Sequence, residues 1–204
     1  MFLAMPKLSN RSVRDQICDT IRAEVLSGAW NNDEPVREQV LADRFGVSRG
    51  PIRDVLSKLS NEGLLVYRPN KGVRVNSPPD EEERQFLQSI RRQIEVYCLQ
   101  RCLGNLTTHD DEQIEGFLLD LAHACKKEDI PAIAESDLAL HRFLVCHASC
   151  EMEAVWMSIT SRLFMDYSRL GNHDEILQEH KDIVQAVQQR DLEAAMAALI
   201  ANII

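Results

Sequence analysis

The stretch from Leu41 to Leu65 limits the possible fold most, because its turn residues allow two short helices joined by one tight turn. Gly46 can take the left-handed conformation that ends a helix, and Ser48 can cap the next one. Pro51 suits the first turn of that second helix. Apolar side chains recur at helical spacing before and after the turn, at Leu41, Ala42, Phe45, Ile52, Val55, Leu56 and Leu59. The stretch therefore predicts a helix-turn-helix.

Two arginines lie one helical turn apart near the start of the second helix. Because Ile52, Val55 and Leu56 occupy its buried face, Arg49 and Arg53 are predicted to point outward. Guanidinium groups placed in this way can reach phosphates or the guanine edge in the major groove of DNA. The second helix is therefore a candidate DNA-reading helix.

The flanking residues complete a small domain. Apolar positions recur every four residues from Ser12 to Leu26, and Ser27-Gly28 ends that helix. After the helix pair, residues 64–67 and 73–75 are rich in β-branched and apolar side chains and enclose a Pro/Asn/Gly turn at 68–72. These residues predict a two-stranded hairpin.

From Ser12 to Asn76 the chain resembles the winged helix of GntR-type bacterial transcriptional regulators. The segment from Val47 to Leu56 matches their Val-Ser-Arg-x-Pro-Ile-Arg-Asp-Val-Leu signature, except that Gly50 stands where the family usually has a threonine that can contact phosphate. The resemblance implies DNA contacts in the helical pair and at the wing tip, from Arg37, Gln39, Ser48, Arg49, Arg53, Lys71 and Gly72.

Length and charge indicate two domains in the 204-residue chain. Residues 1–77 carry 12 Lys and Arg against 9 Asp and Glu, whereas residues 78–204 carry 11 against 23. Only the first part suits a polyanion. Ser77-Pro78-Pro79-Asp80 cannot continue a strand. We therefore predict a winged helix-turn-helix at 1–76, a linker at 77–81 and an effector-binding and dimerisation domain at 82–204.

The N-terminal and cysteine patterns predict a cytoplasmic protein. Residues 1–5 are too short for a signal-peptide core, and no apolar run has the roughly 18 residues of a membrane span. The six cysteines lack the spacing of a disulfide framework, and buried packing is the expected role of Cys18, Cys98, Cys102, Cys125, Cys146 and Cys150. The i,i+4 pairs among them leave metal binding or oxidant sensing as an alternative.

The second domain is predicted to be all-helical, so the fold class is mainly α. Its helices are expected at residues 82–103, 108–127, 130–148, 152–170, 174–189 and 192–203. Such a bundle can enclose a ligand pocket between facing helices.

Three polar residues fall on apolar helix faces of this domain. Asp137 and His141 are four residues apart, and His180 has apolar residues at helical spacing on both sides. One carboxylate and two imidazoles suit a divalent first-row metal, with further positions open to water or a ligand. Taken singly, they are equally compatible with an i,i+4 ion pair and a hydrogen-bonded core histidine. The other histidines, His109, His123, His147 and His173, are expected at the surface or at helix ends.

The same residues resemble the FCD ligand-binding domains of the FadR-type branch of the GntR family. Asp137, His141 and His180 match the family's metal-ligand positions, and Asn202 stands where a last histidine is usual. The resemblance implies a divalent metal ion such as zinc, nickel or manganese. An amide oxygen is a weaker ligand than imidazole for zinc or nickel. With Asn202 in the fourth position, the site is therefore expected to bind these ions less tightly or to favour harder metal ions.

Arg91 matches an arginine that often holds a carboxylate effector in these domains, and its guanidinium suits two-point carboxylate binding. The alternative is a surface ion pair with Glu95 at i,i+4.

Together these features predict a DNA-binding transcriptional regulator that acts as a homodimer on a palindromic operator and responds to a small carboxylate metabolite. The family resemblance implies repression that the metabolite relieves, and activation is the alternative. An enzyme that uses the Asp/His cluster is one alternative, but no nucleophile elbow or phosphate loop supports it. A DNA-binding protein whose helical domain only dimerises is another.

Overall fold

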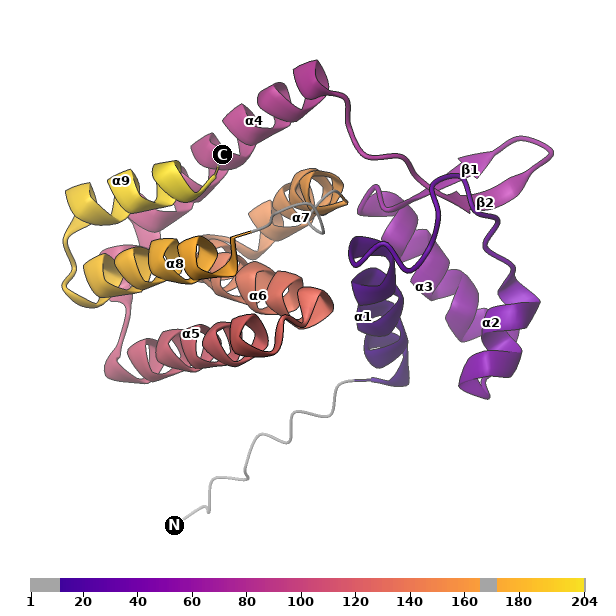
Figure 1. Cartoon of the computed structure of the whole chain (residues 1–204), viewed down its shortest axis with the longest axis horizontal. Helices are drawn as coiled ribbons and strands as arrows, with labels where there is room; N and C mark the ends of the chain where they lie inside the picture. Colours follow the sequence, from indigo (N-terminus) through magenta and orange to yellow (C-terminus); the bar gives the residue numbers. More distant parts are fainter. Residues whose placement is uncertain (1–11, 166–171, 204) are drawn as a thin grey trace, which may run out of the picture.

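A computed structural model describes residues 12–165 and 172–203. Figure 1 shows a small winged-helix unit beside a larger helical bundle; an extended linker leads from the wing to the long helix α4, which runs along the bundle. The winged-helix elements in chain order are α1 (Val13–Leu26), α2 (Glu38–Phe45), α3 (Arg49–Asn61), β1 (Leu65–Arg68) and β2 (Gly72–Val75). The bundle elements are α4 (Glu81–Cys102), η1 (Leu103–Asn105), α5 (Thr108–Lys127), α6 (Ile130–Ala148), α7 (Cys150–Phe164), α8 (His173–Gln188) and α9 (Leu192–Asn202). The predicted mainly-α fold with a small two-stranded wing is confirmed.

The predicted turn between α2 and α3 is present, but one of its details is wrong. Gly46 ends α2 with φ of 65°, in the left-handed region that favours glycine. Ser48 occupies the N-cap position of α3, yet its side chain makes no capping hydrogen bond. Apolar burial therefore holds α3 in place, with Ile52 and Leu59 completely inaccessible to solvent.

The wing has a third contributor that the sequence did not reveal. β1 and β2 pair antiparallel, with Leu65 opposite Val75 and Arg68 opposite Gly72. The segment before α2 runs along the other edge of β2, where the Val36 amide donates to the Val73 carbonyl at 2.9 Å. An isolated bridge between Pro35 and Arg74 marks the same pairing. The wing is thereby fastened to the residues that lead into the helix pair.

Side-chain caps explain where most bundle helices begin. Thr107 and Asp110 form a reciprocal capping box at the start of α5, which satisfies two amides at once. Single side-chain caps begin α4, α6, α8 and α9, at Asp80, Asp129, Asn172 and Asp191. α5 and α6 have the predicted bounds. α7 ends at Phe164, whereas the predicted helix continued to residue 170, and its residues 166–170 lie outside the described part, as do residues 1–5.

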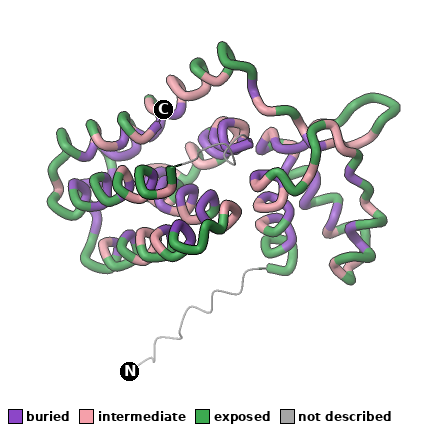
Figure 2. Tube along the Cα trace, viewed as in Figure 1, coloured by how far each residue is buried: buried purple, intermediate pink, exposed green. Residues whose placement is uncertain are grey.

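The buried residues of the bundle belong to two clusters, and α4 and α6 contribute to both. Figure 2 shows buried residues along the inward sides of the bundle helices. Leu99, Leu140 and Val187 are among the residues that fill the half near α8 and α9. The other half, around Trp156 and Ile133, is continuous with the winged-helix core. α1 packs directly against α6, and the buried apolar residues of the two units form one continuous cluster there. Within residues 12–165 and 172–203, no helix combines the length and apolar character needed to cross a membrane.

Candidate functional site

The predicted DNA-reading arginines lie exposed at the start of α3 and contact α2. Arg49 donates from Nε to Gln39 Oε1 at 2.6 Å, so two predicted DNA contacts are neighbours. Arg53 donates from Nε to Glu38 Oε2 at 2.9 Å. Glu38, whose carboxylate would compete with DNA for Arg53, is a neighbour that was not predicted from the sequence. Its position at the first residue of α2, one before Gln39, was the available signal.

The remaining predicted DNA contacts lie at the edges of this surface. Arg37 is the exposed N-cap residue of α2, without a side-chain capping bond, and Ser48 is exposed before α3. Lys71 is exposed in the turn of the wing, where Asn70 and Gly72 both have positive φ. The structure thus places cationic or polar groups on α2, α3 and the wing, the elements that a winged helix presents to DNA.

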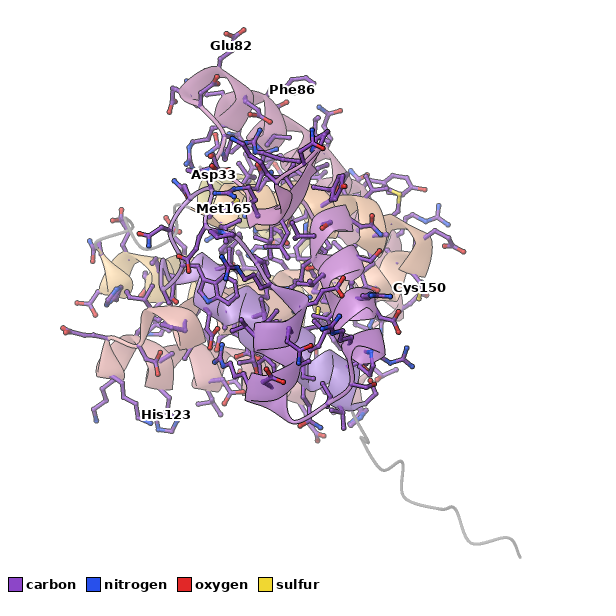
Figure 3. The ribbon with its side chains drawn as sticks, turned by 90° about the vertical axis from the view of Figure 1, so that its right-hand side faces the viewer. Asp33, Glu82, Phe86, His123, Cys150 and Met165 are labelled. Carbon is purple, nitrogen blue, oxygen red and sulfur yellow. The ribbon has the colours of Figure 1, made fainter. Side chains whose placement is uncertain are left out.

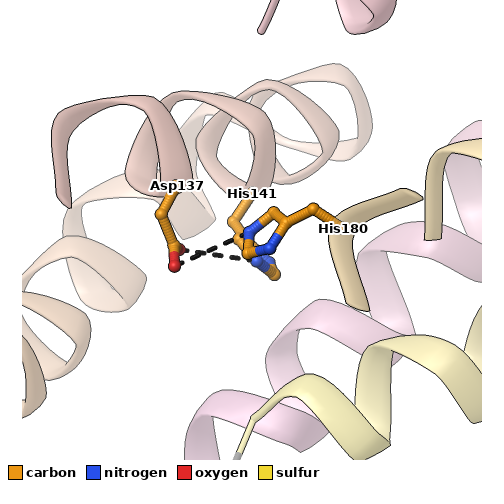
Figure 4. A group of neighbouring side chains, drawn as sticks. All are labelled: Asp137, His141 and His180. Carbon is orange, nitrogen blue, oxygen red and sulfur yellow. Dashed lines mark ion pairs between the residues drawn. The ribbon is translucent and has the colours of Figure 1, made fainter. Parts of the chain in front are cut away.

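The three predicted metal ligands come together inside the bundle. Asp137 and His141 lie on α6 and His180 on α8, and their ligand atoms all lie within 4.8 Å of one another (Figure 4). Asp137 Oδ1 is 3.7 Å from His141 Nε2, and Asp137 Oδ2 is 3.6 Å from His180 Nε2. All three residues are buried, with exposures of 5%, 0% and 1%.

The ring nitrogens of both histidines are arranged in the same way. His180 Nδ1 lies 2.8 Å from the Ile176 carbonyl oxygen, and His141 Nδ1 lies 2.6 Å from Glu95 Oε2. Both Nε2 atoms face Asp137 and make no hydrogen bond within the described chain. Metal-ligating histidines usually have one ring nitrogen hydrogen-bonded to a carboxylate or a backbone carbonyl, which leaves the other nitrogen for the metal. The donor set fits a divalent first-row ion.

Charge interactions across the cluster shift its pKa values. Burial alone would raise the pKa of Asp137, but the positive charge of His180 nearby holds it well below the ordinary value. Burial alone would lower the pKa of His180, but Asp137 raises it. The carboxylate is therefore ionised and ready to bind a cation.

Asn202 lies at the end of α9 and reaches toward α8. Its amide nitrogen donates to Glu179 Oε2 at 3.0 Å, one residue before His180. A direct role of its carbonyl oxygen as a metal ligand stays a prediction.

Arg91 and Glu95 form the ion pair that was one of the two interpretations, but it is buried rather than on the surface. Arg91 Nε donates to Glu95 Oε1 at 2.7 Å, and the residues are 6% and 3% exposed. Arg91 Nη2 has no hydrogen-bond partner among the described residues. Trp156 Nε1 donates to the same Glu95 oxygen at 2.6 Å. Burial alone would raise the pKa of Glu95, but Arg91 and His141 lower it to about 2.

Thr160 lies between the two α7 residues that contact this pair. Trp156, one turn earlier, bonds to Glu95, and the Phe164 ring, one turn later, stacks 5.3 Å from the Arg91 guanidinium. The Thr160 hydroxyl is completely buried and has no hydrogen-bond partner in the described part of the chain. Thr160 therefore lies on the face of α7 that packs against the Arg91–Glu95 pair of α4.

The other candidate residues lie elsewhere. His109 and His123 are exposed, His147 pairs with Asp110 at 3.1 Å, and His173 begins α8 (Figure 3 labels His123). All six cysteines are free thiols; Cys18, Cys98, Cys102 and Cys125 are buried as expected, whereas Cys146 is half-buried and Cys150 exposed.

Comparison with known proteins agrees with these features. The model of the gntR family of bacterial regulatory proteins matches residues 13–75, and the FCD domain model matches residues 87–203. The HTH-type transcriptional repressor RspR of Escherichia coli is 27% identical over 92% of this chain and 84% of its own length. The HTH-type transcriptional regulator McbR of the same species is 24% identical over 95% and 90%. The solved structure of E. coli McbR/YncC superposes with a TM-score of 0.77 at 19% identity, covering 95% of this chain and 94% of that one.

The FCD match alone spans more than half of the chain, and the gntR match covers the winged helix that precedes it. Regulators of this family bind DNA operators and are not enzymes, which excludes the enzyme alternative. The chain therefore belongs to the GntR family of DNA-binding transcriptional regulators, in the branch that carries an FCD ligand-binding domain.

Proposed function

We propose that this protein is a repressor whose affinity for its operator falls when a small carboxylate metabolite binds in the FCD domain. The observation that carries the proposal is the set of buried polar atoms that find no hydrogen-bond partner among the described residues: His141 Nε2, His180 Nε2 and Arg91 Nη2. Buried polar groups cost free energy unless they are paired. A bound metal ion and an anion would pair all three. The name of the relative RspR supports repression as the direction.

Asp137, His141 and His180 would hold a divalent ion such as zinc, nickel or manganese. Such an ion would supply positive charge and open coordination positions for a ligand carboxylate. Arg91 Nη2 and the Thr160 hydroxyl would bind the rest of that ligand. Asn202 would act as a fourth, weaker ligand or would support α8 through Glu179.

On the DNA side, the proposed contacts are those of α2, α3 and the wing. A single winged helix covers a short stretch of DNA, so a homodimer on a palindromic operator would supply the required affinity and specificity. Arg49 and Arg53 would exchange Gln39 and Glu38 for DNA groups when the helix enters the major groove.

α6 is the proposed connection between ligand and DNA. It carries Asp137 and His141 on its inner face and packs against α1 of the winged helix. Leu138, next to Asp137, lines the groove between the two units together with Arg22 and Leu26 of α1. A ligand that favours one position of α6 would thereby favour one arrangement of the winged helices, and it acts only through that difference in affinity.

The test combines metal analysis with operator binding. Untagged protein purified without chelators is expected to hold about one metal ion per chain, and His180→Ala is expected to lose it. Fluorescence anisotropy on a selected operator, with and without a library of small carboxylic acids, is expected to find an acid that changes affinity by about 5- to 150-fold. Metal-free protein that ignores every acid, even after zinc, nickel or manganese is added, would favour the purely dimerising alternative.

A further inference from the structure

One carboxylate links the two halves of the proposed ligand site. Glu95 uses both oxygens: Oε1 accepts from Arg91 Nε at 2.7 Å and from Trp156 Nε1 at 2.6 Å, while Oε2 lies 2.6 Å from His141 Nδ1. Glu95 lies on α4, 46 residues from His141 in the sequence. Glu95 is not itself a member of the group formed by Asp137, His141 and His180.

The direction of the bond between Glu95 and His141 follows from the other partners. Arginine and the indole of tryptophan can only donate hydrogen bonds, so Glu95 accepts from both. A carboxylate beside a permanently charged guanidinium is itself an acceptor at Oε2, and the proton between Oε2 and His141 Nδ1 therefore belongs to the histidine. A neutral His141 with its proton on Nδ1 has its lone pair on Nε2, the atom that faces Asp137.

We propose that Glu95 is a positioning residue for metal binding: it holds His141 in the Nδ1–H tautomer and so keeps Nε2 available as a ligand atom. This proposal rests on the function proposed above. Carboxylates that accept from the second nitrogen of a ligating histidine fix its ring and raise its basicity, and their loss typically costs 10- to 100-fold in metal affinity.

His180 shows why Glu95 in particular matters. The partner of His180 Nδ1 is a backbone carbonyl, which every side-chain substitution would leave in place. His141 depends on a side chain contributed by another helix. The packing of α4 against α6 thus decides the tautomer of one of the three proposed ligands.

Glu95→Gln tests the proposal because an amide cannot replace both functions of the carboxylate. If its oxygen accepts from Arg91 and Trp156, its NH₂ group faces His141 Nδ1 and forces the imidazole proton onto Nε2. We expect zinc affinity, measured by competition with a chelator, to fall by about 10- to 100-fold although all three ligands are retained. Glu81→Gln is the matched control. It removes a negative charge from an exposed position on the same helix, where the carboxylate accepts from Gln85, and it is expected to leave the zinc affinity unchanged.

The position of the imidazole proton on His141 can be measured directly. It would not change if Glu95 only supported the packing of the helices. Histidine ¹⁵N NMR of the metal-free protein, at a pH where the imidazoles are neutral, is expected to place the His141 proton on Nδ1 in the wild type and on Nε2 in Glu95→Gln. A wild-type His141 with its proton on Nε2 would overturn the proposal even if the variant did not fold. Wild-type zinc affinity in a folded Glu95→Gln would overturn it as well.

A Trp30→Phe background makes Trp156 the single tryptophan, because the chain has two. Since the Trp156 indole shares Glu95 with His141, its fluorescence is expected to change during the zinc titration and to follow the weakened binding in Glu95→Gln. The two proposals fail in different ways. A wild-type protein that binds no metal contradicts the metal site but leaves the tautomer measurable, whereas equal zinc affinities contradict only the role of Glu95.

Discussion

Arg22 and Glu62 form a buried two-point ion pair that ties the middle of α1 to the end of α3. Arg22 Nε donates to Glu62 Oε2 and Nη2 donates to Oε1, both at 2.9 Å, and the side chains are only 10% and 8% exposed. Glu62 is the C-cap residue of the predicted DNA-reading helix, and Arg22 lines the groove between α1 and α6. The pair therefore connects the helix that would read DNA to the helix that touches the FCD domain.

Removing one partner of this pair is expected to destabilise the protein strongly. Glu62→Ala leaves the Arg22 charge buried without its main partner, at a cost of about 3 to 5 kcal/mol in the free energy of unfolding. Arg14→Ala is the control, because its pair with Asp54 is 59% exposed on both sides and is worth less than about 1 kcal/mol. Urea unfolding of both variants measures the difference. Equal losses of unfolding free energy in the two variants would show that the buried pair stabilises the fold no more than the exposed pair does.

Arg49→Ala and Arg53→Ala are each expected to weaken operator binding. The loss is about 1 to 3 kcal/mol if the missing contact is bidentate to a base. Lys126→Ala, exposed at the far end of α5, is expected to bind as the wild type does. Anisotropy titrations at one fixed salt concentration compare the three. Wild-type affinity in both arginine variants would argue against α3 as the reading helix.

Glu38→Gln is expected to change DNA binding in the opposite direction. The substitution removes the charge that holds Arg53 in the absence of DNA and also removes a negative charge from the DNA-facing surface. Stronger operator binding, with a steeper dependence on salt, should result. Weaker binding would instead mean that Glu38 orients Arg53 toward its target.

Metal affinity and metal-free stability are expected to change with pH in opposite directions. The pKa of His180 is raised in the folded protein, so its contribution to stability is complete below the unfolded value of about 6.5 and is lost as pH rises through the folded value. Zinc requires the neutral imidazole and competes with that proton, so zinc affinity rises over the same window. Thermal unfolding without metal and zinc titrations across this range measure both. Parallel trends would exclude His180 as the residue responsible.

Gly46→Ala and Gly63→Ala compare backbone strain with and without a close neighbour. Both glycines have positive φ, which costs a non-glycine residue about 1 to 2 kcal/mol. A Cβ at Gly46 would meet nothing within 4 Å, whereas a Cβ at Gly63 would lie 3.0 Å from Arg162 Cγ and Cδ. Arg162 of α7 also bonds to Glu83 of α4. Gly63→Ala is therefore expected to lower the unfolding temperature more than Gly46→Ala, and equal shifts would mean that Arg162 moves freely.

The features that the sequence predicted are those with local causes. The turn at Gly46, the apolar stripe of α3 and the bounds of α5 and α6 follow from periodicity and from turn and cap residues a few positions apart. The shared face of Asp137 and His141 is likewise a matter of four-residue spacing. His180 was placed beside them by its apolar neighbours together with the family pattern.

The features that the sequence did not predict depend on partners far away in the chain. The segment that leads into α2 pairs with β2 across about 40 residues, and Arg22 meets Glu62 at a separation of 40. Ser48 is a residue type that commonly caps helices, and it stands at the N-cap position of α3, but its side chain does not form the capping hydrogen bond. The Arg91–Glu95 pair was foreseen from its spacing, yet its burial was not, because α7 covers it with Trp156 and Phe164.

The sequence by itself determined the elements, the outward arginines of α3 and the family, because periodicity, turn chemistry and signature residues all act over short distances. Only the tertiary structure decided which polar groups are buried together and what each one bonds. Glu95 illustrates the difference. As a residue four positions after Arg91 it predicts an ordinary surface pair, and only the packing of α4 against α6 and α7 turns its carboxylate into the shared acceptor for Arg91, Trp156 and His141. Burial and long-range contact set the chemistry of such a group, and neither is encoded in local spacing.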